Sequence, residues 1–206
     1  MGKLVAGTFV SLDGVMQAPG GPDEDRAGGF AHGGWTFPYF EDPAMDKLIV
    51  EQTVRAEAVL LGRKTYQIFA AHWPRATDPN DAIAVKLNSM RKYVASRTLE
   101  TLDWNNSRLL GDDVPGAVRR LKVETQGELQ VTGSCKLLQT LIANDLVDEF
   151  HLWQFPVVLG TGKRLFGEGT PPGALRLIDS TRFSTGVVVN RYARDGAVKV
   201  GTFTLK

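Results

Sequence analysis

Short apolar segments typical of strands alternate with helix-like segments over the first three quarters of this chain. The clearest is AVLLG, residues 58–62, which has no polar residue and therefore predicts a strand buried on both faces. Strands that alternate with helices form an α/β sheet in which most strands run parallel. Further strands are expected at residues 3–12, 91–96, 127–133 and 147–159, the last of them broken at Pro156.

The segments between these strands predict helices, and the tail predicts antiparallel strands. Asp42 and Pro43 form a good N-cap and first helical residue for the helix that leads into the 58–62 strand. The remaining helices are expected at residues 65–73, 113–124 and 134–146, with an irregular segment at 74–90 and a strand meander at 175–205 that turns near 184–186 and at 195–196. We therefore expect an α/β fold with a mixed, mostly parallel sheet, flanking helices and a C-terminal antiparallel hairpin.

One long Gly- and Pro-rich segment, residues 17–38, interrupts this order. A loop of that length inside a compact domain is usually a lid, a substrate wall or disordered. Trp35 and Phe37 are our candidates for stacking on a planar substrate ring. The competing interpretation is that these aromatic residues fasten the loop to the core.

Composition excludes several classes of partner. A chain of 206 residues with 43% hydrophobic and 23% charged residues fits one soluble domain spanning 1–206. The net charge of +1 provides no general field for nucleic acid or an anionic membrane, so any anion site must be local. The chain begins without a signal-peptide pattern and has no apolar run long enough to span a bilayer, which predicts no membrane partner.

The cysteine and histidine content argues against a disulfide or a metal. Cys135 is the only cysteine, which excludes an intrachain disulfide and fits a reducing cytoplasm. The three histidines are far apart and lack the spacing of metal ligands, so no metal site is expected.

Three expected strands end in residues that suit a phosphorylated cofactor. The first strand end has a glycine, which lets the cofactor approach the backbone closely, then two cations and the start of a helix. The second joins a hydroxyl to a guanidinium, a pair that suits a phosphate monoester, and the third passes from strand to helix through small residues. Each pattern alone is also typical of an ordinary turn or cap, so the inference rests on their coincidence. In order, these candidates are Gly62, Arg63, Lys64 and Thr65; Ser96 and Arg97; and Thr132, Gly133, Ser134 and Cys135.

Two better-known phosphate motifs do not match. Residues 160–164 (GTGKR) resemble a dinucleotide-binding turn, but the third glycine of that motif would fall on Leu165. A P-loop would need Ser or Thr after Lys163 and glycine at Val157, and neither is present.

Taken in order, five segments resemble the dihydrofolate reductase superfamily, and within it the branch of the RibD C-terminal domain, the reductase of bacterial riboflavin biosynthesis. They are SLDGVMQAPG, VLLGRKTYQ, VASRTLE, LQVTGSCKLLQTLIANDLVDEFHL and FPVVLGTGKRLF. The resemblance implies an NADPH-dependent oxidoreductase, usually a homodimer, that reduces a pterin-, flavin- or aminouracil-like heterocycle. One such substrate would be 5-amino-6-(5-phosphoribosylamino)uracil, and dihydrofolate another.

The resemblance also assigns roles to the strand ends. Residues 62–65 would line the cofactor phosphates, Ser96 and Arg97 the adenosine 2′-phosphate, and residues 132–135 the pyrophosphate. The nicotinamide would lie near Ala6, Gly7 and the 11–17 loop. Two departures are expected to matter. Gly133-Ser134 replaces the Gly-Gly pair of dihydrofolate reductases, and GGWTFPYFEDP replaces their Leu-Pro-Trp, which argues against folate itself.

Two carboxylates are candidates for assisting proton transfer to the substrate. Asp46 precedes Gly62 by sixteen residues, which is the spacing of the pterin-binding acid in dihydrofolate reductases, but a solvated acid in a first helical turn would look the same. Asp13 occupies an acidic position that borders the substrate in the RibD branch, but it is also an ordinary turn residue before Gly14.

Two other classes of function stay open at this stage. A non-catalytic nucleotide- or flavin-binding protein would keep the cofactor-binding turns and lack a working acid. A dimeric scaffold would use the same strand ends only as turns.

Overall fold

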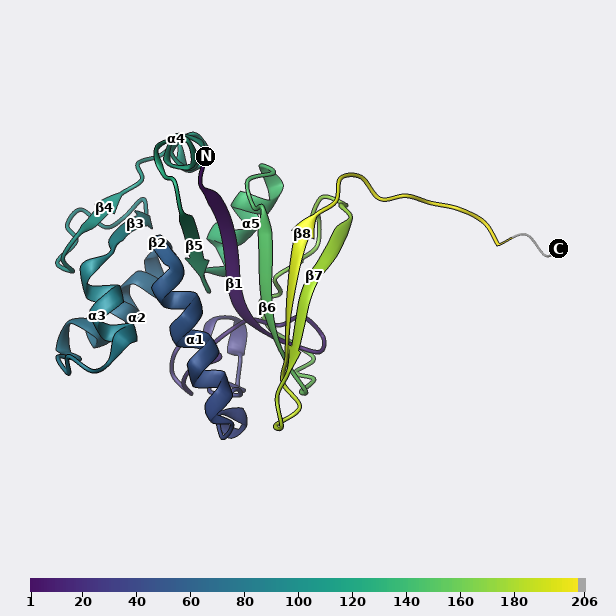
Figure 1. Ribbon diagram of the computed structural model, residues 1–206, viewed down its shortest axis with the longest axis horizontal. Helices are drawn as coiled ribbons and strands as arrows, with labels where there is room; N and C mark the ends of the chain where they lie inside the picture. Colours follow the sequence, from purple (N-terminus) through teal and green to yellow (C-terminus); the bar gives the residue numbers. More distant parts are fainter. Residues whose placement is uncertain (204–206) are drawn as a thin grey trace.

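The computed structural model describes residues 1–203, and its eight strands form one mixed sheet in the order β4-β3-β2-β5-β1-β6-β8-β7 (Figure 1). Neighbouring strands from β4 to β6 are parallel, whereas β8 is antiparallel to both β6 and β7. This confirms the expected mixed sheet with a C-terminal antiparallel hairpin. The strands are β1 Lys3–Ser11, β2 Ala56–Gly62, β3 Arg91–Ala95, β4 Ser107–Leu109, β5 Glu128–Thr132, β6 Glu149–Phe155, β7 Leu175–Arg182 and β8 Val188–Arg194.

Strand β2 is buried on both faces, as its uninterrupted apolar sequence predicts. Ala58 and Leu60 point into a core shared with helices α4 (Val114–Glu124) and α5 (Cys135–Ala143). Val59 and Leu61 point to the opposite face, into a core shared with α2 (Arg63–His72) and α3 (Ala82–Ser89). Alternation of side chains along the strand thus divides one apolar run between two helical layers.

Helix α1, Pro43–Arg55, begins as the sequence predicts and runs alongside the sheet (Figure 1). The Asp42 carboxylate accepts a hydrogen bond from the backbone N–H of Ala44, which caps the helix, and Pro43 occupies its first position. The same carboxylate also accepts hydrogen bonds from the N–H and hydroxyl of Ser184 in the β7–β8 turn. Asp42 therefore fixes the start of α1 to the C-terminal hairpin.

The 17–38 segment is an ordered wall of the fold, with short 3-10 helices at Ala27–Gly29 and Phe37–Tyr39. Trp35 is buried against Phe155 of β6, edge to face at 5.4 Å, and its indole N–H donates to the carbonyl oxygen of Gln17. Phe30 is buried in the same apolar cluster, which also includes Met45 of α1. This packing supports the interpretation that aromatic residues fasten the loop to the core.

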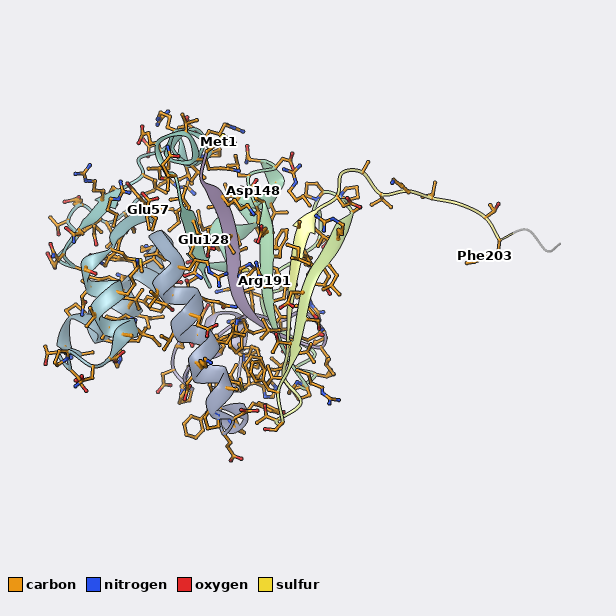
Figure 2. All side chains as sticks on the ribbon, viewed as in Figure 1. Met1, Glu57, Glu128, Asp148, Arg191 and Phe203 are labelled. Carbon is orange, nitrogen blue, oxygen red and sulfur yellow. The ribbon has the colours of Figure 1, made fainter. Side chains whose placement is uncertain are left out.

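Three parts of the chain differ from the sequence prediction. Residues 74–90, expected to be irregular, include α3 and most of the short helix Trp73–Arg75. Asp81 caps α3 by accepting hydrogen bonds from the N–H groups of Ile83 and Ala84. Strand β4 is an edge strand of three residues, too short to show a period in the sequence. After β8, no strand forms up to residue 203, and the rest of the predicted meander, 204–205, lies outside the described residues. The tail leads away from the body, with Phe203 far from the sheet (Figure 2).

Candidate active site

A cavity of about 950 Å³ lies where the carboxyl ends of β1, β2, β3 and β5 meet α1 and the 17–38 loop. Strands β3, β2 and β5 are adjacent in the sheet, so the three predicted turns that follow them open into the same space. Of the predicted cofactor residues, those that line it are Gly62, Arg63, Lys64, Thr65, Ser96, Arg97, Thr132, Gly133, Ser134 and Cys135.

The turns after β2 and β5 are joined through Ser134. Its hydroxyl accepts from the N–H of Gly62 at 2.9 Å and lies 3.0 Å from the hydroxyl of Thr65. Gly133 and Ser134 both have left-handed backbone conformations, with φ of +55° and +60°. A Cβ at position 62 would lie in van der Waals contact with Cβ of Ser134, at 3.4 Å, so the two turns pack directly against each other. Together they form a compact polar wall at the starts of α2 and α5.

The turns after β2 and β3 supply two guanidinium groups. Arg63 donates from Nη1 to the hydroxyl of Thr98 at 2.8 Å, which aims its side chain across the end of β3. Arg97 is exposed at the same rim of the cavity. The Ser96 hydroxyl accepts from the N–H groups of Thr98 and Leu99, which holds the turn that presents Arg97. Two fixed positive charges at one rim favour a phosphate-bearing ligand.

Asp25, in the 17–38 loop, connects two cavity lysines. Its carboxylate accepts from Nζ of Lys64 at 2.7 Å and pairs with Nζ of Lys163, which stands in the GTGKR turn. Burial opposes ionisation of Asp25, but these two hydrogen-bonded cations outweigh it and hold its pKa at about 2. Lys163 was missed because its turn matches no phosphate motif; only the fold brings it to the cavity.

Neither predicted proton-transfer acid lines the cavity. Asp46 is exposed, whereas Met45 and Gln52 of the same helix are buried. Asp46 lies on the same side of α1 as Ile49 and Thr53, but it stands in the first turn, three residues before Ile49 and six residues, about 9 Å, before Gln52, and only these later residues line the cavity. The matching sequence spacing therefore does not bring the carboxylate to the cavity.

Asp13 instead fastens two loops together. Its carboxylate accepts from the Ser11 hydroxyl at 2.6 Å and from the N–H groups of Leu159 and Gly160, and Arg164 lies 3.4 Å away. The Ser11 hydrogen bond is the main reason why the pKa of Asp13 falls to about 2. An acid that remains ionised near neutral pH is a poor proton donor.

Three further predicted residues lie outside the cavity. Ala6 is fully buried in the core on the α4–α5 side of the sheet, and its neighbours Gly7 and Thr8 line the cavity instead. Trp35 belongs to the core described above, and Phe37, which is 80% exposed, is not among the lining residues.

Two residues of the cavity have pKa values raised by burial. The Glu24 side chain lines the cavity and accepts from the N–H of Gly20 at 2.6 Å, while burial raises the pKa of its carboxyl group. Burial likewise raises the pKa of the Cys135 thiol, which donates to the carbonyl oxygen of Arg164. Cys135 therefore behaves as a packing residue and not as an activated thiolate. Burial thus favours the protonated form of Glu24, whereas two lysines keep its neighbour Asp25 ionised.

Within residues 1–203, no helix is both long and apolar enough to cross a bilayer. In the same range, no group of three or more His, Cys, Asp or Glu side chains is arranged to hold a metal ion.

The chain belongs to the RibD C-terminal domain family, whose model matches residues 2–189. Among curated proteins it is 33% identical over 142 residues to the uncharacterized protein YyaP of Bacillus subtilis, a match that covers 68% of this chain and 75% of that protein.

Solved structures confirm the dihydrofolate reductase-like fold. A putative riboflavin biosynthesis protein from a Shewanella species superposes with a TM-score of 0.71 and 20% identity, over 94% of this chain and 99% of that one. A dihydrofolate reductase from Enterococcus faecalis, complexed with NADP(H), superposes with a TM-score of 0.58 and 14% identity, over 94% of this chain and 96% of that one. A Thermotoga maritima deaminase/5-amino-6-(5-phosphoribosylamino)uracil reductase superposes with a TM-score of 0.60 and 15% identity, over 94% of this chain and 56% of that one.

Proposed function

We propose that this protein is an NADPH-dependent reductase of a planar pterin-, flavin- or aminouracil-like heterocycle. One observation carries the proposal: three phosphate-suited strand ends open into a single cavity together with Arg63, Arg97, Lys64 and Lys163. The reductase and NADP(H) named for proteins of the same fold support the same chemistry.

The residues present fit a dinucleotide that carries an additional phosphate. Arg63 and Lys64 would hold the pyrophosphate together with the backbone N–H groups at the starts of α2 and α5. Ser96 and Arg97 would hold the 2′-phosphate at the end of β3. Bound NADPH would supply a hydride for the heterocycle. Gly7 and Thr8 of β1 offer backbone groups to the same cavity, which residues of α1 also line.

Reduction of a C=N or C=O bond also requires a proton. We assign its delivery to Glu24, because it lines the cavity and burial raises its pKa, whereas Asp13 and Asp46 stand outside. A raised pKa favours the protonated form of the carboxyl group, which is the form that a general acid needs.

Replacing Arg97 with alanine is expected to weaken NADPH binding by about 1.5–3 kcal/mol, roughly 10- to 150-fold, and to leave NADH binding nearly unchanged. The reason is that only NADPH carries the 2′-phosphate that Arg97 would contact. Isothermal titration of wild type and Arg97→Ala with both cofactors measures the difference.

Arg120→Ala is the matched control, because Arg120 is exposed on α4 and does not line the cavity. Equal binding of NADPH and NADH by the wild-type protein would contradict the proposal. So would an Arg97→Ala variant that binds both cofactors as wild type does.

A nucleotide- or flavin-binding protein without turnover is the second candidate. It is favoured by the positions of Asp13 and Asp46, neither of which faces the cavity. Such a protein would keep the NADPH preference and the Arg97 effect but would reduce no heterocycle. Measuring the turnover of wild type and of Glu24→Gln separates the two candidates.

We also propose that the chain forms a homodimer through β7. This edge strand exposes the apolar side chains of Leu175, Leu177 and Ile178, and such an edge pairs readily with another chain. Sedimentation velocity is expected to give the mass of two chains for wild type and of one chain for Leu177→Asp. A wild-type protein that stays monomeric at all concentrations would contradict the assignment.

A further inference from the structure

The side chain of Gln52 is the most unusual polar group in the cavity wall. It comes from the sheet-facing side of α1, is 8% exposed, and lines the cavity together with Ile49, Thr53 and Trp153. A glutamine amide placed at such depth normally has hydrogen-bond partners for both of its ends. In residues 1–203, its Nε2 atom is buried and has none.

The orientation of this amide is fixed by Trp153. The indole Nε1–H of Trp153 donates to Oε1 of Gln52 at 3.1 Å. Because an indole N–H can only donate, the oxygen must face Trp153 and the NH₂ group must face the other way. Trp153 is itself held by Phe183, stacked at 5.8 Å with an interplanar angle of 5°, and by the edge of Phe9. The amide cannot exchange its two ends without losing the Trp153 hydrogen bond.

We propose that Gln52 Nε2 is a specificity-determining donor that recognises a carbonyl oxygen on the ring of the substrate. This inference rests on the proposed function and narrows its substrate class to oxo-heterocycles. A neutral, locked NH₂ group stabilises an acceptor and repels another donor, so a ring with amino groups in place of carbonyl groups is rejected. Leaving this donor unpaired against the wrong ring costs binding free energy, which is how a buried polar site discriminates.

A second amide extends the same surface. Gln130 of β5 is buried to a similar extent and lines the cavity beside Gly7 of the neighbouring strand, with its Nε2 atom 3.7 Å from the position of a Cβ at Gly7. Neither amide carries a charge. The part of the cavity wall formed by these two amides thus suits a neutral ring, whereas an acid on α1 would favour a protonated one.

Two pteridines of nearly the same shape test this assignment. Lumazine carries carbonyl groups at ring positions 2 and 4, and 2,4-diaminopteridine carries amino groups there. With NADPH saturating, wild type is expected to bind lumazine about tenfold or more tightly than 2,4-diaminopteridine. Gln52→Leu should lose about tenfold in lumazine affinity and change its affinity for the diamino ring by no more than about twofold.

The variant Trp153→Phe tests whether Trp153 fixes the orientation of the Gln52 amide. Without the indole N–H, the amide of Gln52 is free to present its oxygen, so affinity for 2,4-diaminopteridine should rise about threefold or more. A structural defect would lower the affinity for both rings and would not produce this gain. Gln67→Leu, at an exposed position of α2 outside the cavity, is the matched control and should bind both rings as wild type does.

Fluorescence titration with both rings and with NADPH separates the possible failures. If NADPH binds with its Arg97 dependence but Gln52→Leu binds lumazine as wild type does, the Gln52 assignment is overturned and the proposed function stands. A wild type that binds both rings equally, or neither, also overturns the assignment. If NADPH does not bind, the proposed function itself fails.

Discussion

Replacing Trp35 with alanine is expected to lower the free energy of unfolding by about 3–5 kcal/mol, the range for removing a large buried aromatic side chain. Trp35 is buried against Phe155 and donates its indole N–H to Gln17, so the variant loses packing and leaves that carbonyl without this donor. Urea unfolding monitored by circular dichroism measures the change. Affinity for NADPH is expected to remain within about threefold of wild type.

Phe37→Ala is the matched control for Trp35→Ala. Phe37 lies only two residues away but is 80% exposed, so its removal should change the free energy of unfolding by no more than about 0.5 kcal/mol. If Trp35 stacked on a substrate ring, its removal would weaken lumazine binding and hardly change stability. That pattern would show that Trp35 contacts the substrate.

Replacing Glu24 with glutamine is expected to slow turnover by about 100-fold, the lower range for loss of a general acid. Glutamine retains an oxygen that can accept from the N–H of Gly20 but cannot deliver a proton. Turnover would be measured as NADPH oxidation with the member of a pterin, flavin and aminouracil panel that wild type reduces.

The pH dependence of the rate provides a second readout for Glu24. The pKa of Glu24 is raised, so the wild-type rate should fall as the pH rises through that pKa and the carboxyl group loses its proton. Glu24→Gln should lack this decline. A variant with the wild-type rate and pH profile would assign the proton to water or to another group. A wild type that oxidises no NADPH with any member of the panel would favour the binding protein.

The strand ends that line the cavity could be predicted because they depend on local sequence. A glycine and a cation that follow a buried strand lie at its carboxyl end wherever the strand is placed in a parallel sheet. The adjacency of β3, β2 and β5 then brought together the turns that the sequence had marked separately.

The acids and aromatic residues could not be predicted in the same way, because their roles depend on where the tertiary structure places their side chains. Asp46 has the expected spacing from Gly62, but it lies exposed in the first turn of α1, whereas Ile49, Gln52 and Thr53, further along the helix, line the cavity. Glu24 and Asp25 lie in a segment with no regular period, so their positions follow only from how the loop packs through Trp35 and Phe30.

By itself the sequence determined the alternation of strands and helices, the cap of α1 at Asp42 and the phosphate-suited strand ends, since each of these follows from contacts within a few residues along the chain. The tertiary structure decided which polar groups share the cavity. Lys163 meets Asp25 across 138 residues, and Trp153 fixes Gln52 across 101. Such pairings depend on the packing of α1 and the 17–38 loop over the sheet, and no local sequence pattern predicts that packing.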